Sequence, residues 1–243
     1  MNLRVFNNEA QVGRAAATLV AAQILGKPDS VIGLTAGNTI LDTCHQLLQL
    51  TRDGIIDWQR VKVFSQDEYL GLPSSHELSR FRFLRDKLFS QINLADDALY
   101  APDGMTQDPD AECLNYEKAI QTAGGLDFQL LTLGTRGQIG SIESGADFSL
   151  RTCCSTLSED VQDTLARGSA PADTIPDAAL TLGIGTIMRV PRIILLATDP
   201  SRAMAVASLV HGRIDPAFPA SILQIHPHVT VLLDRSAASV LSR

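Results

Sequence analysis

The chain has 243 residues, of which 45% are hydrophobic, and a formal net charge of -7 at pH 7. A protein this acidic is a poor candidate for binding nucleic acid or an anionic membrane surface. The longest apolar runs are too short to span a bilayer, and the first residues lack the apolar core of a signal peptide. We therefore expect a cytoplasmic protein. Because no linker is evident, we expect a single domain over residues 1–243.

Helical and extended patterns alternate along the chain. The expected helices are 9–25, 39–50, 78–92, 110–122, 178–188 and 201–210. The expected strands are 30–36, 61–65, 128–133, 193–197 and 229–233. This alternation favours an α/β fold, with a mostly parallel open sheet covered by helices on both faces in a doubly wound, Rossmann-like arrangement. The stretch 166–176 is loop-like, and we expect it to be mobile.

Ligands of such sheets bind beyond the carboxyl ends of the strands. That rule selects four segments: GLTAGNT (33–39), FSQDEY (64–69), LGTRGQIGSIESG (133–145) and ATDPSRA (197–203). We expect any chemistry of the protein to be found in them.

In the first segment a strand ends at Ala36 and Gly37, and Asn38 and Thr39 open a helix. Backbone N–H groups at a helix start, together with the positive end of the helix dipole, favour an anion. The phosphate-loop pattern G-x-x-x-x-G-K-[ST] is absent. The alternative is an ordinary strand–helix turn with an Asn or Thr cap.

The second segment places two adjacent acids, Asp67 and Glu68, directly after an apolar strand. Adjacent residues of an extended chain point to opposite sides, so one of them can face a cleft. A carboxylate with restricted access to solvent can act as a general base. The alternative is a solvated acidic turn, and Glu68 is interpreted either as a supporting acid or as a solvated one.

The stretch FSQDEYLGLP resembles the N-M-D-E-Y-x-G-L-P motif of glucosamine-6-phosphate deaminases, whose superfamily includes galactosamine-6-phosphate isomerases and 6-phosphogluconolactonases. Further segments resemble that family in the same order: VIGLTAGNT, DAECLNYEKAI, LGTRGQIGSIESG, DAALTLGIGTIM and FPASILQIHPHVTVLLD. The similarity covers nearly the whole chain and implies the family's fold.

The resemblance implies roles for particular residues. Asp67 stands at the position of the base that moves a proton between C2 and C1 of an open-chain sugar. The positions that hold phosphate in the family carry, in this chain, Ala36, Gly37, Asn38, Thr39, Arg167 and Arg202. Arg202 replaces a lysine, and its planar guanidinium can still grip an anion. The implied ligand is a small anionic sugar, and a sugar phosphate is the expected case. No metal or organic cofactor is implied.

The third segment departs from the family pattern. Arg136 stands in place of an aspartate and Gln138 in place of a histidine, whereas the glutamate is kept as Glu143. In the family this trio opens the pyranose ring, and glutamine cannot titrate. Arg136 is also expected to stabilise an ionised Glu143.

Three interpretations follow for this loop. In the first, Glu143 or a water opens the ring, or the enzyme acts on the small open-chain fraction, and the reaction is slow. In the second, the substrate carries an extra anionic group for Arg136, and in the third the site only binds its ligand. The leading hypothesis is an aldose–ketose isomerase of the amino-sugar deaminase type. The alternatives are a non-catalytic sugar-phosphate sensor and, third, a lactone hydrolase. The resemblance also implies a monomer or a small homo-oligomer, because the chain is shorter than the hexameric members of the family.

The remaining residues of interest receive structural interpretations. His76 lies in the loop after Asp67 and either lines the cleft or stabilises the loop, and Trp58 and Tyr69 are expected to pack. The other histidines show no metal-ligand spacing: His45, His211, His226 and His228. The cysteines show no paired spacing and are interpreted as reduced thiols: Cys44, Cys113, Cys153 and Cys154.

Overall fold

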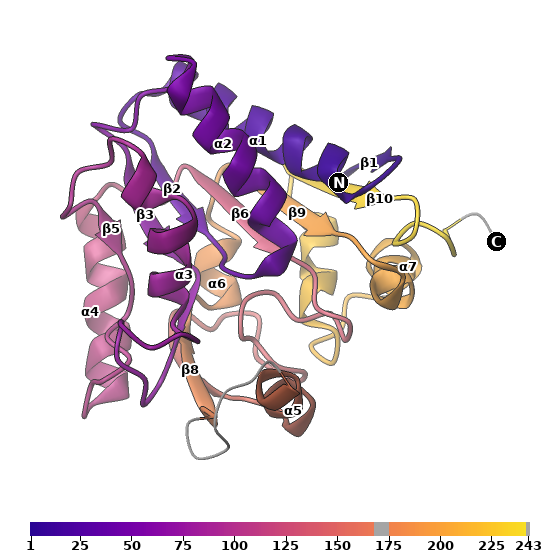
Figure 1. Ribbon diagram of the computed structural model, residues 1–243. Coiled ribbons are helices and arrows are strands. Elements are labelled where there is room, and N and C mark those ends of the chain that lie inside the picture. Colours follow the sequence, from indigo (N-terminus) through magenta and orange to yellow (C-terminus); the bar gives the residue numbers. More distant parts are fainter. Residues whose placement is uncertain (168–174, 242–243) are drawn as a thin grey trace.

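The computed structural model describes residues 1–167 and 175–241 and contains two sheets (Figure 1). The larger is seven-stranded and entirely parallel, in the order β1-β10-β9-β6-β2-β3-β5. Its strands are β1 (Asn2–Phe6), β2 (Val31–Leu34), β3 (Lys62–Ser65), β5 (Leu99–Tyr100), β6 (Phe128–Thr132), β9 (Ile193–Ala197) and β10 (Val229–Asp234). The smaller is antiparallel, in the order β4-β8-β7: β4 (Asp67–Tyr69), β8 (Ala178–Thr181) and β7 (Cys153–Thr156).

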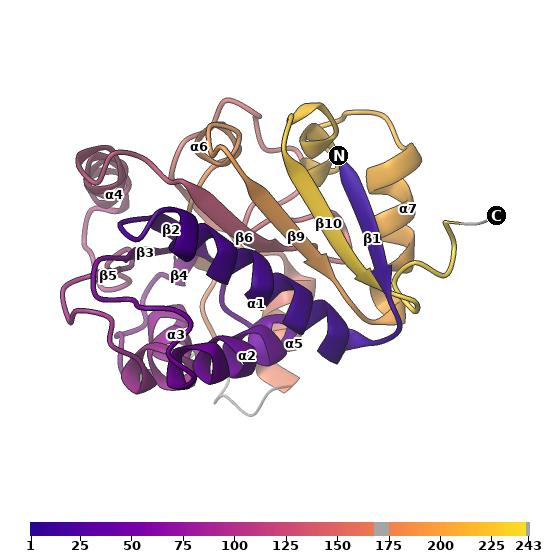
Figure 2. The same cartoon turned by 90° about the horizontal axis from the view of Figure 1, so that it is seen from above.

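Helices cover both faces of the large sheet, as predicted (Figure 2). One face carries α1 (Glu9–Gly26), α2 (Leu41–Arg52) and α3 (Arg80–Lys87). The other carries α4 (Pro109–Thr122), α6 (Ile184–Ile187) and α7 (Ala203–His211). Neighbouring residues of a strand point to opposite faces, so Leu130 of β6 packs on the first side and Leu131 on the second. The interior strands β2 and β9 are accordingly apolar along their whole length.

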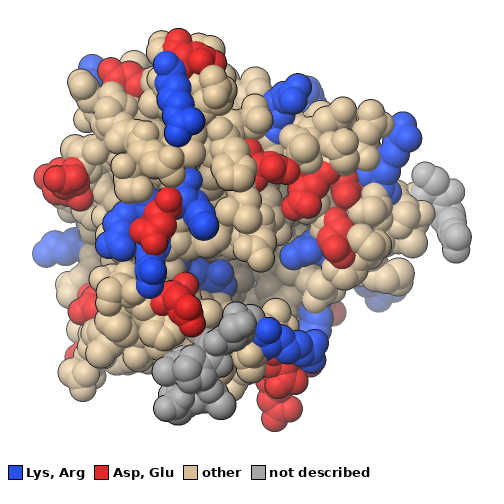
Figure 3. Space-filling view, in the orientation of Figure 1, with Lys and Arg blue, Asp and Glu red and all other residues tan. Residues whose placement is uncertain are grey.

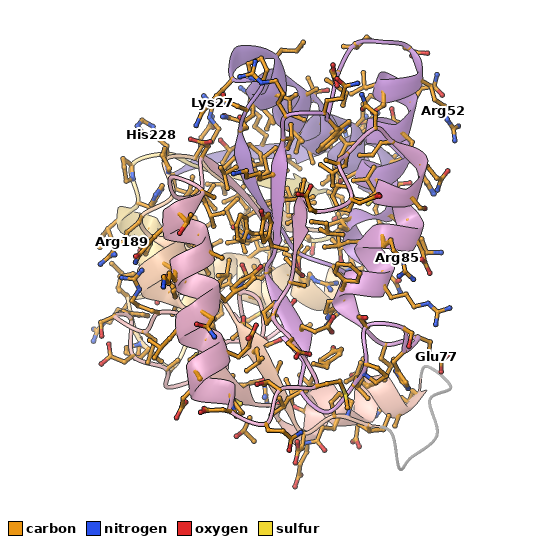
Figure 4. All side chains as sticks on the ribbon, turned by 90° about the vertical axis from the view of Figure 1, so that its left-hand side faces the viewer. Lys27, Arg52, Glu77, Arg85, Arg189 and His228 are labelled. Carbon is orange, nitrogen blue, oxygen red and sulfur yellow. The ribbon has the colours of Figure 1, made fainter. Side chains whose placement is uncertain are left out.

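The strand order reverses between β2 and β6, which places a topological switch point there. From β2 the chain moves outward through β3 to β5, and then returns to β6 on the other side of β2. Because all seven strands are parallel, their carboxyl ends lie at the same end of the sheet, which we call the carboxyl edge. Figure 4 shows the two ends of the sheet: Lys27, which precedes β2, lies far from Glu77, which follows β4. A crevice at the switch point is the expected ligand site of such a sheet.

The prediction of a helix over 178–188 is wrong. Residues Ala178–Thr181 form the central strand of the small sheet, and only Ile184–Ile187 are α-helical. A short buried apolar run does not distinguish a strand from a helix by its period. The helix expected over 78–92 is also shorter: α3 ends at Lys87, and a 3₁₀ turn follows over Phe89–Gln91.

Five further strands and helices were not predicted from the sequence: β1, β4, β5, β7 and α5. The first strand, β1, lies at an exposed edge of the sheet, so its apolar signal is weak. β7 is likewise only half covered, and the helix α5 (Glu159–Arg167) has no fully buried residue. The stretch expected to be mobile begins within the end of α5, and its residues 168–174 lie outside the described part of the chain.

Over the described ranges no helix is long and apolar enough to cross a membrane. All four cysteines are free, and burial raises the pKa of both Cys44 and Cys113 to about 12. Trp58 and Tyr69 are buried, in agreement with the packing roles expected for them. His226 is buried too, with its Nε2 2.9 Å from the carbonyl oxygen of Val190.

A buried carboxylate, Glu117 of α4, ties the helical layer to the small sheet. It accepts hydrogen bonds from the guanidinium of Arg151, the hydroxyl of Thr186, and both the backbone N–H and the hydroxyl of Thr152. Burial opposes its ionisation, but the hydrogen bonds from Thr186, Arg151 and Thr152 outweigh burial and lower the Glu117 pKa. The ionised form therefore stabilises the fold.

Glu117→Gln is expected to destabilise the protein by about 1–3 kcal/mol at pH 7, because buried donors lose a charged acceptor. The wild-type advantage is present above the ordinary glutamate pKa and is lost as the pH falls through the lower pKa of the folded state. Urea unfolding between pH 3 and pH 7 measures this difference, with the exposed Glu77→Gln as control. A difference that does not shrink in acid would contradict it.

Candidate active site

The candidate base, Asp67, is the first residue of β4 and is separated from the end of β3 by Gln66 alone. It is 3% exposed. The hydroxyl of Ser141 donates a hydrogen bond of 2.6 Å to its Oδ2, and Nε of Arg80 lies 3.9 Å from its Oδ1. A carboxylate held by one hydroxyl and faced by one cation is ordered and shielded from water, as a general base requires.

A layer of buried amide and hydroxyl groups supports this position. The Gln66 side chain donates to Leu182 O at 3.1 Å and accepts from Gln129 at 2.9 Å. Gly140 packs directly against this layer and has a φ of +61. A Cβ atom at this position would lie 2.4 Å from Nε2 of Gln66. Only glycine fits this backbone and this approach. The loop 133–145 is thereby held close to β4, which brings Ser141 to Asp67.

Glu68 points away from the site and is not solvated. It is 2% exposed and accepts four hydrogen bonds: from the Ser79 hydroxyl and from the backbone N–H groups of Tyr69, Arg80 and Phe81. Two of these N–H groups belong to the first turn of α3, where helical partners are lacking. The interpretation of Glu68 as a solvated acid is thus wrong, and its carboxylate fixes the start of α3.

Arg80 was missed by the sequence analysis. It is the first residue of α3, and its guanidinium donates to Ala36 O at 3.3 Å and to the Tyr69 hydroxyl. Its guanidinium carbon also lies 4.6 Å from the centre of the Tyr69 ring. The sequence signal for Arg80 was a Ser–Arg pair at the start of a helix shortly after Asp67. Hydrophobic periodicity predicts the helix but does not show that its first residue faces a cleft.

The Gly37 turn, residues 36–39, follows β2 at the switch point. Gly37 adopts φ +142, which favours glycine, and the 3₁₀ turn Asn38–Ile40 leads directly into α2. Asn38 and Thr39 are at least partly exposed, whereas Ala36 is buried. The turn thus presents the backbone of a helix start toward the shared edge of the strands.

The structure brings together Arg136, Gln138 and Glu143. The amide of Gln138 donates to Glu143 Oε2 at 3.5 Å, and Arg136 lies 3.4 Å from the same oxygen. Ser158 donates to the other oxygen at 3.2 Å. Arg136 also pairs with Asp160 of α5 at 2.8 Å. These two carboxylates are partners of Arg136 within the chain, and they tie the loop 133–145 to α5.

Arg202 joins the ends of two strands. Its Nε donates to Leu133 O at 2.9 Å and its Nη1 to Thr198 O at 3.1 Å. The turn that presents it contains Asp199 at φ +83, the one non-glycine residue with positive φ in the described chain. Such backbone strain persists where the surrounding structure imposes it and is common at ligand sites.

Two further residues lie apart from this group. Arg167 is exposed at the end of α5, and the contacts of the described residues do not join it to the other predicted phosphate ligands. The Nδ1 of His76 accepts a hydrogen bond from the backbone of Leu78 at 3.2 Å, which stabilises the loop after β4.

Figure 3 shows a recess near the centre of the face drawn, below α2, with Lys or Arg atoms in its wall. Within the residues that the structure places, no three His, Cys, Asp or Glu side chains are grouped in a way that could hold a metal ion. The groups at the carboxyl edge are thus one buried carboxylate, several arginines and exposed backbone. They suit a small anionic ligand and proton transfer.

Comparison with known proteins gives a consistent picture. The family model described as glucosamine-6-phosphate isomerases/6-phosphogluconolactonase matches residues 7–232. The glucosamine-6-phosphate deaminase of Bacillus pumilus is 39% identical over 240 residues, covering 99% of this chain and all of that protein. The deaminase of Alkaliphilus oremlandii is 36% identical over 241 residues, again covering 99% and 100%.

Solved structures agree with this relationship. A monomeric glucosamine-6-phosphate deaminase superimposes with a TM-score of 0.96 at 38% identity, covering 99% of this chain and 100% of that one. The 6-phosphogluconolactonase from Trypanosoma cruzi shares the fold, with a TM-score of 0.80 at 19% identity and coverage of 100% and 97%. The chain belongs to the glucosamine-6-phosphate isomerase/6-phosphogluconolactonase family.

Proposed function

We propose that the protein is an aldose–ketose isomerase of the amino-sugar deaminase type, which converts a hexosamine 6-phosphate to a ketose 6-phosphate and ammonia. The observation that carries the proposal is the buried Asp67 carboxylate, hydrogen-bonded by Ser141 beside the Gly37 turn. Relatives named glucosamine-6-phosphate deaminase, 36–39% identical over the full chain, support it. A small anionic sugar is then the ligand.

In this proposal Asp67 takes the C2 proton of the open-chain sugar and returns it at C1. The electron pair of the broken C–H bond forms a C1–C2 double bond while the π pair of the C1 carbonyl moves onto O1, which takes a proton from water and becomes a hydroxyl. The resulting enolamine is then protonated at C1 as the nitrogen lone pair forms a C2–N double bond, which leaves an imine at C2. Water adds to that carbon, and ammonia departs. The Ser141 hydrogen bond holds the carboxylate in one orientation, so that the same oxygen can serve both carbons in turn.

The phosphate is assigned to the Gly37 turn and the arginines near it. Backbone N–H groups of residues 38 and 39 supply donors without charge, and Arg202 supplies a guanidinium between the ends of β6 and β9. Arg167 belongs to this assignment only by the family resemblance.

Ring opening is assigned to Glu143, because Gln138 cannot carry a proton. The carboxylate of Glu143 is held by Ser158, Gln138 and Arg136. Because no histidine of the described chain stands beside Glu143 to exchange a proton with it, ring opening is expected to be slow. This arrangement also keeps a second candidate function in view: a protein that binds a sugar phosphate without turning it over.

Time-resolved proton NMR with glucosamine 6-phosphate or galactosamine 6-phosphate in D₂O tests the proposal. Ketose phosphate and ammonium are the expected products. Loss of the C2 proton signal without product would keep Asp67 as the base and place the failure at a later step. Saturable binding with an unchanged spectrum would contradict catalysis and favour the binding function.

Asp67→Asn is expected to lower turnover by about 10²–10⁴-fold, because the amide cannot accept the C2 proton. Thermal stabilisation by the sugar phosphate should persist, since the phosphate ligands are intact. Asp97→Asn, an exposed aspartate, is the matched control. Normal turnover by Asp67→Asn would show that another group is the base.

Arg202→Met is expected to raise KM about 10–100-fold with a smaller change in kcat, because a charged hydrogen bond to the phosphate is lost. Initial rates over a range of sugar-phosphate concentrations measure this, with the exposed Arg213→Met as control. An unchanged KM in a folded variant would remove Arg202 from the phosphate site.

A further inference from the structure

Arg80 contacts both halves of the proposed site. Its Nη1 donates to Ala36 O of the Gly37 turn, and its Nη2 donates to the Tyr69 hydroxyl on β4. Its backbone N–H donates to Glu68 at 2.9 Å. One residue of α3 thus holds the Gly37 turn and the strand that carries the candidate base.

The third side of the guanidinium faces Asp67. Nε of Arg80 and Oδ1 of Asp67 are both buried, lack a hydrogen-bond partner in the described structure, and lie 3.9 Å apart. A buried carboxylate and a largely buried guanidinium are each costly without a complementary charge. Among the described residues, each is the ion-pair partner that the other has within 4 Å.

The other titratable groups facing Asp67 do not supply a positive charge. Tyr69 and Glu68 belong to β4 itself, and Tyr116 faces it from α4. Burial raises the pKa of both tyrosines, so they are neutral phenols at pH 7. Glu68 is an acid and accepts hydrogen bonds from its own four donors. From β8 and the loop 133–145, Thr181 and Ser141 contribute hydroxyls only.

We propose that Arg80 is a positioning residue for Asp67, which stabilises the ionised carboxylate and couples it to the Gly37 turn. A Cβ atom at Gly37 would lie 3.9 Å from Nη1 of Arg80, so an anion on that turn is close to the same guanidinium. The same guanidinium then interacts with the bound phosphate and with the carboxylate of Asp67. The catalytic part of this role rests on the proposed isomerase function.

The direct test follows Asp67 itself and requires no turnover. The side-chain carboxyl of Asp67 is titrated by NMR in protein labelled with ¹³C-aspartate and is assigned by its loss in Asp67→Asn. In Arg80→Met its midpoint is expected to rise by about 1–3 pH units relative to wild type, because a cation at this distance is removed. Arg80→Lys, which keeps the charge, should show a smaller rise.

The matched control is Arg85→Met on the same helix. Arg85 points away from the molecule in Figure 4 and pairs with Asp86 at 3.2 Å. It should leave the Asp67 midpoint unchanged. If Arg80→Met does not fold, the Asp67 midpoint is measured in Arg80→Gln instead. The glutamine amide can replace one hydrogen bond of Arg80 but carries no charge.

Kinetics provide a second readout. Arg80→Met is expected to lower kcat/KM at acidic pH more than at alkaline pH, so that the acid limb of the pH–rate profile moves to higher pH. A purely structural role would lower the rate equally at all pH values. An Asp67 midpoint equal to wild type in a folded, uncharged variant would overturn the proposal. A shifted midpoint in a protein without turnover would instead retain the Arg80–Asp67 pairing and refute the isomerase function.

Discussion

The burial of one carboxylate is the constraint on which the site depends. Asp67 emerges from the edge of the parallel sheet into a position almost without solvent, and a charge there must be compensated. Its two partners come from different parts of the chain, Ser141 from the loop after β6 and Arg80 from α3. Both elements must therefore stay docked on β4 for the carboxylate to keep its two partners.

The neighbouring acid shows how the same strand performs a second task. Side chains alternate along β4, so Asp67 faces the site and Glu68 faces the start of α3. Glu68 accepts hydrogen bonds from the first N–H groups of α3 and so fixes the position of the helix start. The side chain of Arg80 extends from that position toward Asp67. One acid is the candidate base, and the adjacent one positions the helix that carries the arginine facing it.

Much of the large sheet is predictable from the sequence, because strands buried on both faces are short, continuous apolar runs. The same argument fails for Ala178–Thr181, which is just as apolar yet belongs to an antiparallel sheet. The segments at the carboxyl edge are also predictable, since parallel strands bring their ends together. Asp67, Gly37, Glu143 and Arg202 were found in this way, although their roles remain proposals.

Arg80 and Ser141 were not found, for a physical reason. Neither follows a strand of the parallel sheet directly, and each reaches Asp67 only through a tertiary contact. Arg80 depends on the docking of a short helix, and Ser141 on a close approach that Gly140 permits. Such contacts are set by packing and leave no periodic signal in the sequence.

The two sides of the site differ in how they meet the solvent. The pair of Arg136 and Asp160 is exposed, with side-chain exposures of 47% and 75%, whereas Asp67 and Ser141 are buried. Mobile ions screen exposed charges far more than buried ones. Ionic strength therefore acts selectively on the attachment of the Glu143 loop to α5 and leaves the surroundings of the base nearly untouched. Salt concentration is thus a variable that distinguishes the Arg136–Glu143 side of the site from the Asp67 side.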